Sequence, residues 1–76
     1  MQEDIHIGKL IKKQIHEEGR SITWFARKLS YERRNIYNLF EKPSLNSHLL
    51  LRISKILKHN FFEHYYKYLK DHLSNN

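Results

Sequence analysis

Apolar residues recur every three or four positions along this chain, a spacing typical of helices that each bury one face. Ile7, Leu10, Ile11 and Ile15 form the first such group, and four more groups follow. No segment alternates apolar and polar residues for long enough to predict a strand. Because the 76 residues include only two glycines and one proline, few positions interrupt these groups. The spacing therefore predicts an all-α fold of five short helices.

Capping residues and glycine mark the ends of the first predicted helices. The first spans residues 5–18, where Asp4 is placed to cap its start and Gly19 to end it in a left-handed turn. Ser21 offers the cap of a second helix, and a break of about three residues separates this helix from a third. The positions predicted to face the core from the second and third helices are Ile22, Phe25, Ala26, Leu29, Ile36, Leu39 and Phe40.

Two more helices follow the only loop that contains proline, "KPSLNS". Asn60 and Glu63 resemble a capping box that opens the fifth helix. The fourth helix presents an apolar stripe of Leu49, Leu50, Ile53, Ile56 and Leu57. The stripe predicted to face the core from the fifth helix is Phe62, Tyr65, Tyr66, Leu69 and Leu73.

The length allows one domain, residues 1–76, with an ordered core over about 5–73. A chain of this size buries only about 60% of its unfolded surface, so binding a partner would add stability. Without cysteine it has neither a disulfide nor a thiolate metal site. The N-terminus lacks the basic start of a signal peptide, and no apolar run reaches about 18 residues. We therefore expect a cytoplasmic protein with no membrane segment.

The formal net charge of +6 favours an anionic partner, with nucleic acid first and an acidic lipid or acidic protein second. This charge is concentrated in the middle of the chain. Residues 20–34 contain one acid, Glu32, and five bases, Arg20, Arg27, Lys28, Arg33 and Arg34. Charges that served only solubility would have interspersed signs. The central segment is therefore the predicted site of contact with the anion.

Residues 22–41 are predicted to form a helix-turn-helix. Two helices joined by so few residues cannot lie antiparallel, and a steep crossing needs a small residue such as Ala26. Apolar anchors lie before the turn (Leu29), within it (Tyr31) and after it (Ile36). In a helix-turn-helix the second helix stands out from the body and fits a major groove about 12 Å wide.

The run "ITWFARKLSYERRNIYNLF" resembles the helix-turn-helix of the lambda repressor/Cro-like (Xre-type) family of DNA-binding regulators. In that family an alanine is followed at fixed spacings by a turn residue and by apolar residues, and Ala26, Ser30, Tyr31, Ile36 and Leu39 fit these spacings. The segments "IGKLIKKQI" and "PSLNSHLLLRISKIL" resemble the first and fourth helices of the family. The resemblance covers about residues 6–60 and implies a compact five-helix DNA-binding domain.

Two positions depart from the family pattern. The turn residue is usually glycine, because a left-handed backbone is common there, whereas this chain has Ser30. The family often opens its second helix with a glutamine that touches a phosphate, and Ile22 stands in its place. Ser21 and Thr23 are the nearest residues that offer a weaker contact of this kind.

The resemblance places the base-contacting positions on Arg33, Arg34 and Asn38. Stepping about 100° per residue from Ile36 puts Arg34 and Asn38 on the side of the third helix opposite the core, and Arg33 lies in its first turn. Arginine pairs with guanine and asparagine with adenine. Glu32 is interpreted as a helix cap rather than a reader of cytosine. The residues expected to contact the DNA backbone are Ser21, Thr23, Arg27, Lys28, Tyr37, Glu41, Lys42 and Ser44.

The fifth helix carries a second stripe, which is Phe61, Tyr65, Tyr68 and His72. One short helix cannot bury two stripes in so small a domain. A self-association surface is one interpretation, since the fifth helix is a common dimer contact in lambda-repressor-like proteins. Half-exposed tyrosines on a basic surface are the other, and a membrane-surface role is disfavoured because Tyr rather than Leu dominates.

Other sites are not predicted. Six histidines show no i, i+4 pair and no HExxH motif, so we expect surface or capping roles and no metal site. Trp24 is expected to pack beside the core rather than to stack on bases. No phosphate loop, nucleophile elbow or carboxylate pair is present. We therefore expect no enzyme activity, no cofactor and no small-molecule ligand.

The prediction is a sequence-specific, double-stranded DNA-binding transcriptional regulator that acts as a homodimer. Repression by occupancy is the expected mode, because the chain has no separate acidic activation segment. The alternative is a protein-interaction or antitoxin-like module on the same fold. These two hypotheses differ in whether Arg33 and Arg34 or the stripe on the fifth helix contacts the partner.

Overall fold

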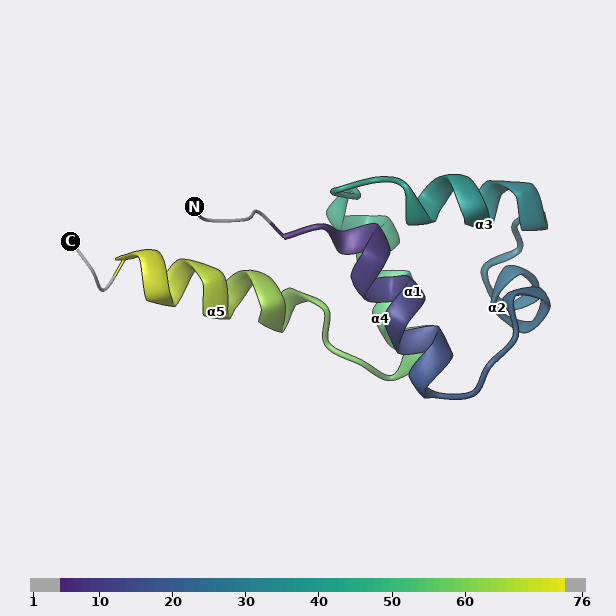
Figure 1. Cartoon of the computed structure of the whole chain (residues 1–76), viewed down its shortest axis with the longest axis horizontal. Coiled ribbons are helices and arrows are strands. Elements are labelled where there is room, and N and C mark those ends of the chain that lie inside the picture. The colour runs from purple at the N-terminus through teal and green to yellow at the C-terminus, as the bar shows by residue number, and fades with distance from the viewer. Residues whose placement is uncertain (1–4, 74–76) are drawn as a thin grey trace.

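The computed structural model describes residues 5–73, and over this range the chain is helical with no strand. Its elements are α1 (Ile7–Glu17), α2 (Ile22–Leu29), α3 (Arg33–Phe40), α4 (Ser47–Leu57) and α5 (Phe62–Leu73). The prediction of five helices is confirmed. Helices α1 to α4 form a compact body from which α5 extends (Figure 1), so the molecule measures 44 × 23 × 22 Å.

Side chains cap the starts of the first helices. The Oγ of Ser21 accepts a hydrogen bond of 3.0 Å from the backbone N–H of Trp24, as predicted. Helix α1 begins at Ile7 rather than at residue 5, and the imidazole of His6 caps it. The predicted cap Asp4 lies outside the described residues. Glu32 occupies the N-cap position of α3, but its side chain makes no capping hydrogen bond.

Three residues turn the chain through a left-handed backbone. Gly19, with φ of 70°, ends the first helical segment as predicted. Ser30, with φ of 62°, ends α2, so the backbone takes the conformation that glycine adopts most easily although the residue is serine. Lys58, with φ of 52°, ends α4. The strain at each of the two non-glycine residues is about 1 kcal/mol.

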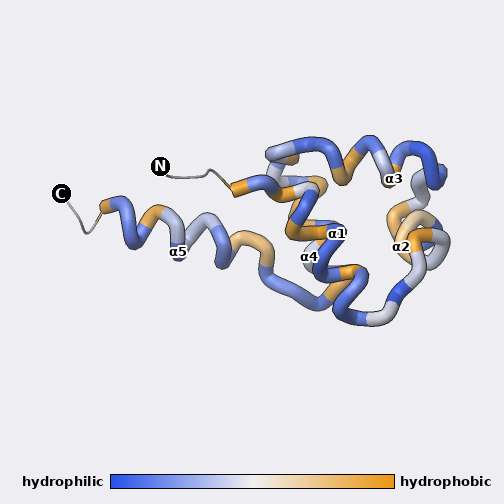
Figure 2. The backbone as a smooth tube through the Cα atoms, viewed as in Figure 1, coloured by the Kyte–Doolittle hydropathy of each residue, from blue (hydrophilic) through white to orange (hydrophobic). Residues whose placement is uncertain are grey.

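The hydrophobic core lies between α1, α2, α3 and α4. Every core position predicted for these helices is buried or half-buried, and no polar side chain is buried among the described residues. Figure 2 shows the hydrophobic residues of α1 recurring along its length. The buried set is Ile7, Ile11, Ile15, Phe25, Ala26, Leu29, Ile36, Leu39, Phe40, Leu50, Ile53, Leu57 and Phe61.

The start of α1 is hydrogen-bonded to the loop between α3 and α4. The N–H of Ile7 donates to the carbonyl of Pro43 at 2.8 Å, and the N–H of Gly8 donates to that of Lys42 at 2.9 Å. A Cβ at Gly8 would lie 2.4 Å from the carbonyl oxygen of Phe40, which is closer than real Cβ contacts. The glycine therefore permits a close approach that sets where α3 ends.

Helix α4 holds the end of α2. The guanidinium of Arg52 donates a hydrogen bond of 3.1 Å to the carbonyl oxygen of Leu29, 23 residues earlier in the chain. This carbonyl is in the last turn of α2, where no intrahelical N–H is available to it. The bond connects the turn before α3 to α4.

Helix α5 differs from the prediction in which face it turns to the body. None of its residues is fully buried. Of the predicted inward residues, Phe62 and Tyr65 pack against the core, but Tyr66, Leu69 and Leu73 are 64%, 54% and 66% exposed. Phe61, assigned to the exposed stripe, is instead fully buried and precedes α5. Because Phe61 fills the core at the end of the connection, α5 leaves the body with the Tyr65 side of the helix turned inward.

Candidate nucleic-acid interface

Helix α3 has one buried and one exposed side. Ile36 and Leu39 are buried and hold the helix on the body, as predicted. Arg33, Arg34 and Asn38 are all exposed. Figure 2 shows that the first turn of α3, which carries the two arginines, is strongly hydrophilic. The three side chains predicted to reach bases therefore lie on solvent-accessible positions of one short helix.

The two arginines have no structural role within the described part of the chain. Neither forms an ion pair or a hydrogen bond with a side chain or carbonyl of residues 5–73. By contrast, Arg52 bonds a carbonyl and Arg20 lies 4.0 Å from the carboxylate of Glu18. No ion pair in this range therefore neutralises the positive charge of the two arginines. This charge also lies at the positive end of the α3 dipole, where a cation is unfavourable.

The remaining predicted contacts surround α3 on two sides. Tyr37 is exposed beside Asn38, and its ring meets Phe40 edge to face with centroids 6.3 Å apart. All of the predicted backbone-contacting residues are exposed to solvent. Those that precede α3 are Ser21, Thr23, Arg27 and Lys28, and those in or after it are Tyr37, Glu41, Lys42 and Ser44. Helix α3 ends at Phe40, so Glu41 and Lys42 belong to the connection to α4.

The connection between α2 and α3 is short and steeply bent. Residues 30–32 join the two helices, and α2 runs nearly along the line of sight in Figure 1 while α3 lies across it. The N–H of Tyr31 donates to the carbonyl of Ala26 at 2.9 Å, closing the end of α2. The side chain of Tyr31 packs against the core. Tyr31 therefore fixes the turn both to the end of α2 and to the core.

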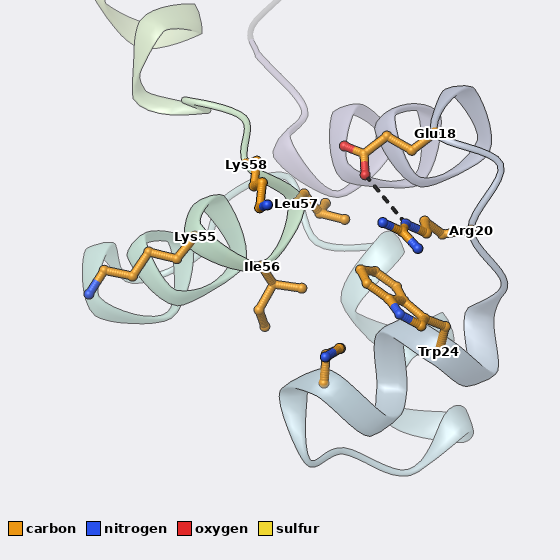
Figure 3. Close-up of a pocket in the computed structure, with 8 residues that line it drawn as sticks. Glu18, Arg20, Trp24, Lys55, Ile56, Leu57 and Lys58 are labelled. Carbon is orange, nitrogen blue, oxygen red and sulfur yellow. Dashed lines mark ion pairs between the residues drawn. The ribbon is translucent and has the colours of Figure 1, made fainter.

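A second basic surface lies between α2 and α4, in a cleft of about 780 Å³ (Figure 3). The guanidinium of Arg20 lies 4.3 Å from the centre of the Trp24 ring, and the amine of Lys28 lies 5.9 Å from it. Trp24 is half-buried against the core, as predicted. Because Lys28 lies on this side of α2 and no residue of α3 lines the cleft, Lys28 is separated from the arginines of α3.

The residues predicted as a dimer surface are not all available. Phe61 is fully buried, which corrects its assignment. Tyr65 packs against the core, and Tyr65 and Tyr68 line a pocket together with Ile5. The His72 ring stacks on Tyr68 with centroids 3.9 Å apart, and both side chains are half-buried. The Tyr65 and Tyr68 side of α5 therefore lies beside Ile5, which precedes α1, and Ser44, in the connection between α3 and α4.

Sequence reasoning missed Gly8 and Arg52, which position α3 from outside residues 22–41. Gly8 lies inside a helical pattern, where an isolated glycine is a signal of close backbone approach. Arg52 follows the apolar triplet "LLL", and that position alone carries no signal for a long-range hydrogen bond.

Two further site classes bear on function. Within residues 5–73 no group of three or more imidazole or carboxylate side chains is arranged to hold a metal ion. In the same range, no helix has the length and apolarity that crossing a bilayer requires. A scan against protein-family models and searches of curated proteins and of solved structures found no match to this chain.

Proposed function

We propose that this protein is a sequence-specific, double-stranded DNA-binding regulator of the lambda repressor/Cro-like kind. Helix α2, the turn over 30–32 and α3 would act as a helix-turn-helix, and α3 would enter the major groove. The observation that carries this proposal is the exposed set Arg33, Arg34 and Asn38 on a helix whose opposite side is buried. Two arginines with no partner among the described residues suit guanine O6 and N7, and asparagine suits adenine.

The net charge of +6 supports an anionic partner, and its concentration over residues 20–34 supports one that approaches α2 and α3. Ser21, Thr23 and Arg27 at α2, with Tyr37, Lys42 and Ser44 at and after α3, would contact phosphates on both sides of the groove. Lys28 would contribute less to phosphate binding than the sequence predicts, because its amine lies near Trp24 in the cleft between α2 and α4.

A homodimer on a two-fold operator is part of the proposal. Half-sites would then be about 34–36 Å apart. The surface proposed for self-association is the exposed stripe of Tyr66, Leu69 and Leu73, in place of the stripe that contains Phe61. Repression by occupancy of the operator is the expected outcome of binding.

Selection of bound sequences from a random duplex library tests the proposal. We expect a palindromic consensus and an affinity that falls steeply between low and physiological salt, because each phosphate contact releases counterions. Arg34→Ala should cost about 1–3 kcal/mol and relax the preference at one base pair, whereas Lys42→Ala should weaken all sequences alike. Absence of binding at low salt, or binding insensitive to salt, would reject the proposal.

The exposed stripe on α5 also favours a second candidate, a protein-interaction or antitoxin-like module. In that case Tyr66→Ser and Leu69→Ser would abolish capture of the partner protein, and Arg33→Ala and Arg34→Ala would leave it unchanged. A consensus from the duplex library would exclude this module as the main function.

A further inference from the structure

Two histidines that lie five residues apart meet at the junction of α4 and α5. The Nε2 atom of His59, in the connection, lies 3.1 Å from the Nε2 atom of His64, in the first half of α5. Both side chains are half-buried. The ring centroids are 5.3 Å apart. The two imidazoles therefore point their Nε2 atoms at each other.

The backbone holds both rings in this arrangement. The N–H of His59 donates to the carbonyl of Ser54 at 3.1 Å, and the N–H of His64 donates to that of Phe61 at 3.2 Å. The buried ring of Phe61 lies between them in sequence and contacts His59, with centroids 4.5 Å apart. Because Phe61 belongs to the core, the pair is built on a fixed part of the molecule.

The hydrogen bond within the pair leaves a lone pair available. In the hydrogen-bonded pair one Nε2 donates and the other accepts, so at least one ring already presents an Nε2 lone pair.

The separation of the two nitrogens is close to that of a shared metal ion. Two imidazole nitrogens that each lie 2.0–2.1 Å from one tetrahedral ion are about 3.3–3.4 Å apart. Starting from the observed 3.1 Å, binding requires an opening of about 0.2–0.3 Å and a tilt of both rings, so that their lone pairs converge on the ion rather than on each other. We propose that His59 and His64 form a two-imidazole site for a divalent transition-metal ion of the Zn²⁺, Ni²⁺ or Cu²⁺ class, which imidazole ligands suit.

The surroundings determine how the rest of the coordination is completed. A pocket of about 140 Å³ adjoins the pair, and its lining includes Gln14 and Glu17 of α1. No third imidazole or carboxylate among residues 5–73 is in place as a ligand, so water fills the remaining positions. Lys13 in the same pocket opposes a cation and Glu17 favours it. The site is therefore weaker than a closed four-ligand zinc site.

Metal binding changes where the imidazole protons lie. Both Nε2 atoms must present lone pairs, so the ring that donates in the hydrogen bond moves its hydrogen to Nδ1 through solvent. A pair of neutral rings releases no net proton, and each ring that is initially protonated releases one. The metal replaces the hydrogen bond and ties the connection after α4 to α5, which has no buried residue of its own.

The test uses the full chain without a polyhistidine tag, treated with a chelator and titrated with ZnCl₂, NiCl₂ and, as a hard-cation control, MgCl₂. Calorimetry and native mass spectrometry should give one Zn²⁺ or Ni²⁺ per chain and no Mg²⁺. His59→Gln and His64→Gln should each lower the affinity at least tenfold. His48→Gln, at an exposed position of α4, should leave it unchanged.

Long-range ¹H–¹⁵N spectra of the imidazoles give a readout that needs no variant. On addition of Zn²⁺ the Nε2 signals of His59 and His64 should shift together, with both rings in the Nδ1–H form. A pair that stays hydrogen-bonded in excess metal would overturn the site, as would unchanged affinity in both glutamine variants. DNA affinity of the same samples is a separate measurement, so failure of the metal site leaves the proposed function untouched.

Discussion

The body and α5 differ in how much apolar surface they bury. In the body, thirteen apolar side chains are buried among four short helices and the end of the last connection. In α5, twelve residues form a helix with no fully buried side chain. Most of the free energy of burial is therefore concentrated in residues 7–61. The difference indicates that α5 is positioned near its start, by Phe61, the histidine pair and the contacts of Phe62 and Tyr65 with the core, rather than by packing along its whole length.

The largest expected effect tests whether Phe61 belongs to the body. Phe61→Ala should lower the free energy of unfolding by about 3–5 kcal/mol, because it removes a fully buried ring and leaves a cavity. Urea unfolding followed by circular dichroism measures this. Phe62→Ala is the matched control, since the neighbouring ring is only half-buried and should cost less. Equal losses of unfolding free energy in the two variants would show that Phe61 is not the last core residue before α5.

The next effect tests the close approach of Gly8 in α1 to the end of α3. Gly8→Ala should destabilise by about 1–3 kcal/mol, because the added Cβ would overlap the carbonyl oxygen of Phe40. Helix propensity alone would favour alanine by about 1 kcal/mol, so the sign of the change separates the two causes. Gly19→Ala, where no atom lies within 4 Å of the new Cβ, should cost only the left-handed strain of about 1 kcal/mol. Stabilisation by Gly8→Ala would contradict the close approach.

A smaller effect concerns the turn before α3. Ser30→Gly should stabilise the body by about 0.5–1 kcal/mol, because glycine adopts the left-handed conformation without strain. Thermal unfolding should show a higher midpoint. Lys58→Gly, at the left-handed end of α4, is the control and should give a similar gain. A loss at Ser30 alone would mean that its side chain stabilises the turn.

The smallest effect on stability is expected in α5. Leu69→Ser should change the free energy of unfolding by no more than about 0.5 kcal/mol, since its side chain is exposed. The same variant should weaken self-association, measured by analytical ultracentrifugation over a range of concentrations. Glu63→Gln, at an exposed and polar position of the same helix, should leave self-association unchanged. A large loss of stability in Leu69→Ser would show that α5 packs on the body.

The sequence predicted the body better than α5, and the reason is the number of apolar stripes. Each of the first four helices has one stripe, so its inward side is unambiguous, and Ile36 and Leu39 are buried as expected. The fifth helix has two apolar stripes, and which of them faces the body depends on the direction in which the chain leaves Phe61. That direction comes from the left-handed Lys58 and the burial of Phe61, neither of which helical periodicity contains.

The two candidate sites also differ in how well helical periodicity predicts them. The exposure of Arg34 and Asn38 followed from their places opposite Ile36 on one helix, whereas Arg33 was assigned from its place in the first turn. The meeting of His59 and His64 did not, because a spacing of five does not align two residues on one face of a helix. Their contact arises across a turn, where neighbours depend on the path of the backbone.

The hydrogen bonds from the start of α1 to Lys42 and Pro43 define the smallest fragment that could keep α3 in its native place. They join parts of the chain about 35 residues apart, so a peptide covering only residues 22–41 would lose them together with the core partners of Phe40. A graft of α3 onto another protein would need to carry α1 as well. The minimal transplantable unit is therefore the whole body, residues 5–61, and the face that α3 presents is a property of all of it.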